Sequence, residues 1–266
     1  GRMVGRAAVG LLGCFKKEGM SEAALLQAAE KAKKYYLRPA ADTEGWQALQ
    51  PFGQTEVLVS VIVPVHNGEK DLKQCLNSIL AQECGSTVEI IAVNDNSTDS
   101  SSDILEEYAN WGEVRMVELT KETGGSAAKA RNAGILQAKG EYLLFVDCDD
   151  VLLPGAISAL LQKAQQTGAD IVQGGWQYLD GDGKFGAAQR FAEHIYEKRT
   201  AYDCLDLPGT PWAKLYRRSL FDEIRFPAGY TCFEDAVIHF LIFPAAEKIA
   251  SISQVVYAWR RNANGI

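Results

Sequence analysis

Three carboxylates stand within four residues of the sequence, directly after an apolar run that is typical of a buried strand. Asp147, Asp149 and Asp150 form the string Asp-Cys-Asp-Asp after residues 142–146. Carboxylates packed this closely repel one another, and at the end of a buried strand they are poorly hydrated. A hard divalent cation such as Mg²⁺ or Mn²⁺ would compensate them, because it is commonly held by one or two carboxylates plus substrate phosphates. The alternative is a solvated acidic turn before the next helix.

Polar side chains also follow two earlier apolar runs. Pro64-Val65-His66-Asn67 ends the first, and Asn94-Asp95-Asn96-Ser97 ends the second. A polar residue after a strand is often a turn former or a helix N-cap, and that is our interpretation of Ser97, Thr98 and Asp99. For Asp95 a ligand-binding role and a structural role are equally consistent with the sequence.

The remaining candidates are a basic helix and a second acidic pair. Gly124-Gly125-Ser126 opens a segment carrying Lys129 and Arg131, and a glycine-rich helix start offers backbone amides to an anion. Arg131 could equally be a plain surface arginine. Glu234 and Asp235 precede an apolar helix, where they are either helix caps or, near a bound electrophile, a general base.

The elements that position these residues alternate between buried strands and amphipathic helices. Alternation at this spacing predicts a mostly parallel sheet flanked by helices, in which ligands bind beyond the carboxyl ends of the strands. The expected strands are 57–65, 88–93, 114–119 and 142–146, and the expected helices are 71–82, 104–111, 126–138, one starting near Pro154, and 236–243. Residues 1–55 differ in composition and are expected to form an N-terminal helical extension and linker, followed by the main α/β domain over 56–266.

Composition narrows the class of protein. The chain has 266 residues and a formal net charge of −7, which argues against a nucleic-acid binder. The six cysteines show no metal-finger spacing, so we expect free thiols in a reducing cytoplasm rather than export, despite a faint likeness of residues 2–14 to a lipoprotein signal. No apolar run is long enough for a transmembrane helix. The Asp180-Gly181-Asp182-Gly183 string predicts a hairpin turn rather than a calcium loop, because Phe191 stands where the loop's last glutamate belongs.

Seven strings, in this order, resemble the inverting family 2 glycosyltransferases, whose GT-A fold is a Rossmann-like α/β sandwich. They are VSVIVPVHN, IIAVNDNSTDSS, GGSAAKARNAGI, GEYLLFVDCDD, PWAKLYRRSLF, CFEDAVIHF and YAWRRNANGI, and the resemblance covers residues 59–266. It implies transfer of a sugar from a nucleoside-diphosphate donor, with UDP favoured, to a hydroxyl of a glycan or lipid-linked saccharide. It also implies a divalent metal, an inverting single displacement, and a role in making surface polysaccharide, in the cytoplasm or at the inner face of the membrane with peripheral association.

The resemblance assigns expected roles to individual residues. Asp235 matches the catalytic base, and Asp149 matches the metal-binding carboxylate of the DxD motif formed with Asp147 and Cys148. The donor side would be built from Pro64, His66, Asn67, Asp95, Arg131, Asp147, Cys148 and Arg260, with Asp95 accepting from the uracil imide N–H, and the acceptor side from Trp212, Lys214 and Glu234.

Three departures from the family pattern and three rival functions remain open. His66 stands where the family often has Tyr, Ala213 where it has Asn, and Asn264-Gly265 where Gly-Ser is common. The rivals are a nucleotidyltransferase of related fold, a haloacid-dehalogenase-type phosphatase, and a domain that binds nucleotide-sugar or glycan without turnover. The first would need a basic triphosphate loop soon after the first strand, and the second a Gly or Thr after the second Asp, where Asp150 stands.

Overall fold

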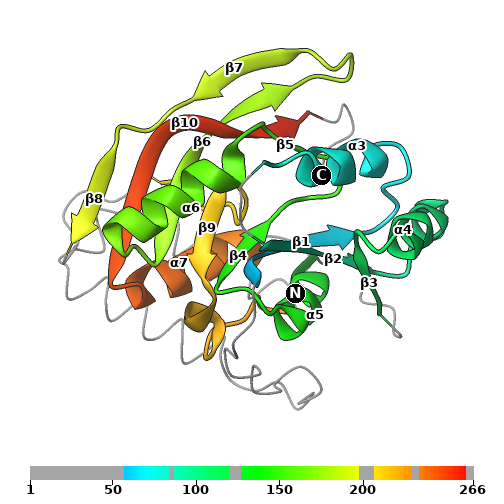
Figure 1. Ribbon diagram of the computed structural model, residues 1–266, viewed down its shortest axis with the longest axis horizontal. Coiled ribbons are helices and arrows are strands. Elements are labelled where there is room, and N and C mark those ends of the chain that lie inside the picture. The colour runs from blue at the N-terminus through cyan, green and yellow to red at the C-terminus, as the bar shows by residue number, and fades with distance from the viewer. Residues whose placement is uncertain (1–56, 84–86, 120–126, 198–206, 229–233, 262–266) are drawn as a thin grey trace, which may run out of the picture.

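A computed structural model describes residues 57–83, 87–119, 127–197, 207–228 and 234–261. Within these ranges ten strands form one sheet, and helices lie on both of its faces (Figure 1). The strands are β1 Val57–Val65, β2 Thr87–Asn94, β3 Arg115–Glu118, β4 Tyr142–Phe145, β5 Val151–Leu152, β6 Ile171–Leu179, β7 Phe185–Gln189, β8 His194–Glu197, β9 Lys214–Arg217 and β10 Lys248–Arg260. The helices are α3 Leu72–Leu80, α4 Ser101–Asn110, α5 Ala127–Gln137, α6 Ala156–Thr167, the 3₁₀ helix η2 Arg218–Phe221 and α7 Glu234–Ala245.

The period-two alternation of each strand divides the core into two layers. In β1, Val61 and Val63 face one layer and Ile62 faces the other, because successive side chains of a strand point to opposite faces. The first layer is covered by α3, α4 and α6, and the second by α5, η2 and α7. The predicted sandwich of a sheet between helices is thereby confirmed.

The sheet is parallel where the sequence predicted it and mixed beyond that point. Strand order is β3-β2-β1-β4-β9-β6-β10-β5, with β7 on β6 and β8 on β10. The pairs β2–β3, β1–β2 and β1–β4 are parallel, as is β6–β10, whereas β9 runs antiparallel to both β4 and β6. Since β9 opposes both neighbours, β4 and β6 run the same way. The carboxyl ends of β1, β2, β4, β6 and β10 therefore meet at one edge, which we call the carboxyl edge.

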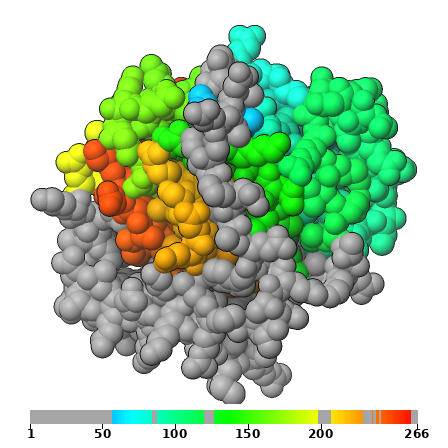
Figure 2. Space-filling model, turned by 60° about the horizontal axis from the view of Figure 1, so that its bottom comes forward, coloured from blue at the N-terminus to red at the C-terminus, as the bar shows by residue number. Residues whose placement is uncertain are grey.

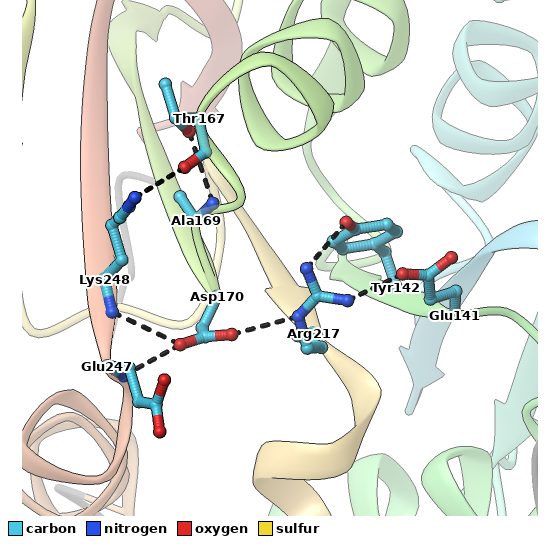
Figure 3. Close-up of polar contacts among 8 residues, drawn as sticks. All are labelled: Glu141, Tyr142, Thr167, Ala169, Asp170, Arg217, Glu247 and Lys248. Carbon is cyan, nitrogen blue, oxygen red and sulfur yellow. Dashed lines mark hydrogen bonds and ion pairs between the residues drawn. The ribbon is translucent and has the colours of Figure 1, made fainter.

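A polar network lies at the other edge of the sheet, where β4, β6 and β10 begin and β9 ends (Figure 3). Arg217, the last residue of β9, donates from Nε to Asp170 Oδ1 at 2.9 Å, from Nη1 to Glu141 Oε1 at 2.6 Å and from Nη2 to the Tyr142 hydroxyl at 3.1 Å. Asp170 Oδ2 also accepts the backbone N–H of Glu247 at 2.8 Å. One arginine and one aspartate thus hold the starts of β4, β6 and β10 together, far along the sheet from the carboxyl edge.

Two further predictions concern turns and the membrane. Asp180 Oδ1 accepts the backbone N–H groups of Asp182 and Lys184, and β6 and β7 pair antiparallel on either side, so the hairpin prediction is confirmed. Across the described ranges, every helix is too short or too polar to cross a membrane. The predicted N-terminal extension and the glycine-rich string 124–126 lie outside the described residues.

Candidate active site

The loops after β1 and β2 are bound to each other by short hydrogen bonds at the carboxyl edge. The Asp95 carbonyl oxygen lies 2.7 Å from His66 Nδ1, and the Asp95 N–H donates to the Val65 carbonyl oxygen at 2.8 Å. Asn67 Oδ1 accepts the Thr98 N–H at 2.7 Å, and Asn67 has a φ of 52°, a left-handed conformation that asparagine tolerates better than most residues. Pro64 and Asp95 are buried, while His66 and Asn67 are exposed, so the predicted nucleobase residues form one rigid rim.

The interpretation of Asp99 as a turn residue is confirmed. Its Oδ1 accepts the Ser101 N–H at 3.0 Å and its Oδ2 accepts the Glu69 N–H at 3.0 Å. Asp99 therefore fastens the start of α4 to the loop after β1, and the ends of β1 and β2 are held as one unit.

Arg131 and Asp147 form an ion pair that ties α5 to the acidic loop after β4. Arg131 Nη2 lies 2.8 Å from Asp147 Oδ1, and the guanidinium carbon lies 5.3 Å from the centre of the Phe226 ring. Arg131 is 4% exposed, so the interpretation of it as a plain surface arginine is wrong. The pair is formed inside the protein because α5 packs against β1 and β2 and places its buried face beside the end of β4.

Within the acidic string, the Asp150 carboxylate is hydrogen-bonded through both of its oxygens by other groups of the protein. Its Oδ2 accepts the Tyr257 hydroxyl at 2.7 Å and its Oδ1 accepts the Arg260 N–H at 2.7 Å. Burial, with the charges of Asp147 and Asp149 beside it, raises the pKa of Asp150 well above its usual range. The string is therefore not a solvated acidic turn, because its last carboxylate is buried and bound to the final strand.

Arg260, the last residue of β10, binds the acidic loop and α3 at the carboxyl edge. Its Nε donates to the Asp149 carbonyl oxygen at 2.7 Å and lies 3.3 Å from Asp71 Oδ1, and its Nη2 donates to Gln74 Oε1. The residue is 6% exposed. The predicted diphosphate-side arginine thus lies against the DxD loop and the start of α3.

Cys148 separates Asp147 from Asp149 and points inward. Burial of its thiol, with the charge of Asp149 adding, raises the pKa of Cys148 to about 12. A Cβ on Gly68 would come within 2.9 Å of Cys148 Sγ, so the loop after β1 packs closely on the acidic loop only because residue 68 is glycine. Cys75 and Cys148 are both free thiols, as predicted for these two residues.

Asp235 is the second residue of α7 and lies within electrostatic reach of the buried Lys214. Burial lowers the pKa of Lys214 to about 7, and the negative charge of Asp235 acts in the opposite direction. Burial also raises the pKa of Tyr216, while the charge of Arg131 lowers it and that of Asp235 raises it further. Asp235 and Arg131 therefore lie within electrostatic reach of the same tyrosine. In Figure 2 the segment of β9 and η2 separates α7 and the start of β10 from the α5 side of the molecule.

Trp212 and Lys214 lie inside the protein at the start of β9. Lys214 is 0% exposed and its Nζ donates to the Thr210 carbonyl oxygen, while Trp212 stacks on Tyr257 with ring centres 4.9 Å apart. Their acceptor-side role remains a prediction. The position of Glu234 at the start of α7 is described, but its side chain is not.

Tyr257 is a residue of this site that the sequence reasoning missed. Its hydroxyl accepts the Asp147 N–H at 3.0 Å and donates to Asp150, so one ring joins β10 to both ends of the acidic string. The signal available in the sequence was its place three residues before Arg260 in the YAWR string.

The acidic loop offers oxygen ligands of the kind that a magnesium or manganese ion prefers. Asp147 pairs with Arg131, Asp150 binds Tyr257 and Arg260, and the half-buried Asp149 lies between them in the chain. Among the side chains that the structure describes, no group of three or more His, Cys, Asp and Glu forms a closed metal cage. The donor set fits an ion held by few carboxylates together with substrate phosphates.

Comparison with known proteins decides the family. The model of glycosyl transferase family 2 matches residues 60–225, which contain most of β1 together with β2, the acidic loop and β9. The chain belongs to glycosyl transferase family 2. It is an enzyme family, and the relatives of this family 2 glycosyltransferase are named for the transfer of sugars.

Two relatives and one distant neighbour illustrate the likeness. Glycosyltransferase GlyG of Streptococcus pneumoniae serotype 4 is 33% identical over 221 residues, which are 79% of this chain and 72% of GlyG. The crystal structure of S. aureus TarS 1-349 in complex with UDP-GlcNAc superposes with a TM-score of 0.68 at 27% identity, covering 79% of this chain and 60% of that one. Mannosyltransferase PcManGT from Pyrobaculum calidifontis, in complex with GDP-Man and Mn²⁺, shares the fold at a TM-score of 0.58 and 17% identity, over 97% of this chain and 69% of that one.

These comparisons confirm the predicted GT-A type of α/β fold and the assignment as a glycosyltransferase. The chain spans less than two thirds of the TarS chain that it matches. The donor, acceptor and residue roles of this family 2 glycosyltransferase are therefore argued as proposals below.

Proposed function

We propose that this enzyme transfers a sugar from a UDP-sugar to a hydroxyl of a saccharide acceptor, with inversion at the anomeric carbon and with a divalent metal ion. The observation that carries the proposal is that Asp95 and the Asp147–Asp149 loop follow parallel strands at one carboxyl edge, where Arg131 pairs with Asp147. The charges of Arg131 and Asp235 both act on Tyr216, which supports including Asp235 in the same site. An activated sugar at this edge would have a nucleotide on one side and a base on the other.

The donor is bound, in this proposal, by the rim formed by the loops after β1 and β2. Asp95 accepts the imide N–H of uracil, and Pro64, His66 and Asn67 line the base pocket. The hydrogen bonds of the Asp95 backbone to Val65 and His66 fix the position of this residue, which supports the assignment. The TarS complex with UDP-GlcNAc supports a UDP-sugar as the donor class.

Asp149 would hold the divalent ion, with Asp147 and Cys148 shaping the loop around it. When bound, the ion supplies a positive charge that stabilises the departing diphosphate. Arg131 keeps Asp147 in place through the 2.8 Å ion pair, and Tyr257 and Arg260 fix the loop through Asp150. The loop is thus preorganised by hydrogen bonds.

Asp235 acts as the general base in this proposal. It takes the proton from the acceptor hydroxyl as that oxygen attacks the anomeric carbon, opposite the leaving UDP. The carboxylate of Asp235 lies within electrostatic reach of the buried Lys214, which supports placing the two residues in one site. Trp212, Lys214 and Glu234 then support the acceptor side, close to where α7 begins.

The decisive experiment compares Asp235→Asn with Asp182→Asn, a matched change in the exposed β6–β7 turn. UDP release from UDP-glucose and UDP-N-acetylglucosamine is measured with Mn²⁺, with and without a saccharide acceptor, and UDP binding is measured by calorimetry. We expect Asp235→Asn to lose about 10²–10⁴-fold in turnover with the UDP dissociation constant within twofold of the wild type. Asp182→Asn should keep both values.

Three outcomes would contradict parts of the proposal. Intact turnover in Asp235→Asn would remove Asp235 from the role of base. A wild-type chain that binds UDP but releases none from any donor would favour the nucleotide-sugar-binding alternative. A wild-type chain that does not bind UDP would overturn the donor assignment altogether.

The relatives also suggest the setting of the reaction. The relative TarS of Staphylococcus aureus is named as a poly(ribitol-phosphate) beta-N-acetylglucosaminyltransferase. We propose that the present enzyme extends a surface polysaccharide from the cytoplasmic side.

A further inference from the structure

An aromatic cluster extends from the acidic loop to the surface along the ends of β6 and β10. Trp176 pairs with Tyr257 and Tyr178 pairs with Trp259 in the register of these two parallel strands. Residues two apart in a strand share a face, so all four rings lie on the same face of the sheet.

The rings form a stack whose exposure increases outward. Tyr257 and Trp212 are stacked at 4.9 Å with planes 5° apart, and Trp212 and Trp259 are stacked at 6.4 Å with planes 15° apart. Tyr257 is 0% exposed, Trp212 7% and Trp259 37%. Trp176 meets both Trp212 and Trp259 edge-on, which braces the stack from the side. Trp259 is therefore a rigidly supported aromatic surface at the outer end.

The inner end of this stack is part of the candidate active site. The Tyr257 hydroxyl binds Asp150 at 2.7 Å and the Asp147 N–H at 3.0 Å, and Arg260, which follows Trp259, binds the Asp149 carbonyl oxygen. Any molecule lying on Trp259 would adjoin the acidic loop, where the donor diphosphate is proposed to bind. Arg261 already lies 4.4 Å from the centre of the Tyr178 ring, so one face of that ring is covered.

We propose that Trp259, braced by Trp176 and Trp212, is the platform on which a pyranose ring of the saccharide acceptor lies. Aromatic faces carry negative electrostatic potential and attract the weakly positive C–H groups of a sugar ring. A rigid tryptophan also loses little conformational freedom on binding, which suits a flat, polar-edged ligand. The inference rests on the proposed transferase function and adds the element that recognises the acceptor.

The test uses the five tryptophans of the chain as reporters. The full chain is labelled with 5-fluorotryptophan, its ¹⁹F resonances are assigned by single Trp→Phe changes, and UDP with Mn²⁺ is added first, followed by chitotetraose or maltotetraose. We expect at least one of these saccharides to shift the Trp259 resonance in a saturable manner. Trp111, which is 60% exposed at the end of α4, is the internal control and should not shift.

Variants separate a binding role from a structural one. Trp259→Ala should weaken saccharide binding, followed at the Trp176 resonance, by at least tenfold, and Trp259→Phe should restore part of it. UDP binding by both variants shows that the fold and the donor site are intact. Trp111→Ala should leave saccharide binding unchanged.

Other results would overturn the inference without touching the proposed function. These are UDP binding with no saccharide response at Trp259, equal shifts at Trp111 and Trp259, or a concentration-dependent Trp259 shift accompanied by dimerisation. If UDP alone shifted Trp259 as a direct contact, the platform would belong to the donor. Loss of UDP binding by the wild type would instead contradict the proposed function.

Discussion

The Tyr257 hydroxyl donates a 2.7 Å hydrogen bond to Asp150, and this contact joins the last strand of the sheet to the acidic loop after β4. The same oxygen accepts the Asp147 N–H, so one buried phenol spans the acidic string from its first to its last residue. Because the loop carries like charges, it needs such internal partners to hold one conformation.

Tyr257→Phe should therefore loosen the loop while leaving the core packed. It removes both hydrogen bonds and leaves Asp150 a buried carboxylate with fewer donors, so we expect the free energy of unfolding to fall by about 1–3 kcal/mol. Manganese-dependent UDP affinity should fall as well, because Asp149 is no longer held in place. Urea unfolding and calorimetry measure the two effects. Tyr108→Phe, which removes a hydroxyl bound to Asn77 on α3, is the control that should leave UDP affinity unchanged.

Ala213, which directly precedes β9, has a left-handed φ of 57°. Side chains before and after it therefore do not follow the regular alternation between the two faces of the sheet. The Ala213 carbonyl oxygen accepts the Gly174 N–H at 2.9 Å, which holds this conformation. A left-handed conformation costs an alanine about 1–2 kcal/mol. Ala213→Gly relieves that strain but loses a buried methyl and adds chain entropy, so we expect a change in unfolding free energy within about 0.5 kcal/mol of zero.

Ala164→Gly, an equally buried change within α6, has no strain to relieve and should lower the free energy of unfolding by about 1–2 kcal/mol. Urea denaturation of both variants checks the prediction. Equal losses in the two variants would show that Ala213 is not strained.

Lys214 should make stability depend on pH. Its folded pKa of about 7 lies below the unfolded value of about 10.4, so the unfolded chain binds more protons between these two values. The free energy of unfolding should therefore rise with pH through this site, by up to about 1.4 kcal/mol per pH unit, and the gain should be absent below pH 7. Urea titrations of the wild type and Lys214→Met at pH 7, 7.75 and 8.5 isolate the contribution. Parallel profiles for the two proteins would refute the shifted pKa.

The side chain of Arg217 should contribute more to the free energy of unfolding than an ion pair on the surface does. Arg217→Met removes donors to Asp170, Glu141 and Tyr142, and leaves Asp170 without its charged partner, so we expect a loss of about 2–3 kcal/mol. Lys73→Met breaks an exposed 2.8 Å pair with Glu107 and should cost at most about 1 kcal/mol.

UDP affinity should not change in Arg217→Met, because the network of Figure 3 joins the strand ends away from the carboxyl edge. Thermal unfolding measures the loss of stability, and calorimetry measures the UDP affinity. A stability loss no larger than that of Lys73→Met would show that the network is not a cooperative unit.

The sequence by itself determined the first half of the sheet and the residues at its carboxyl edge. The apolar run 57–65 became β1 without a change of boundary, and the acidic string begins one residue after the end of β4. These features are local: strand burial, helix periodicity and turn chemistry depend on neighbouring residues. The order of the seven strings then identified the family, which the family match confirmed.

Only the tertiary structure decided how the distant parts meet. No spacing rule brings β9 between β4 and β6 in antiparallel orientation, and regular alternation would have put Trp212 on the same face as Tyr216, whereas the left-handed Ala213 places the two rings in different layers of the core. The burial of Arg131, the bond from Tyr257 to Asp150 and the tryptophan stack likewise join residues far apart in the chain. Their energies depend on desolvation and on packing between elements, and neither is encoded in any local pattern.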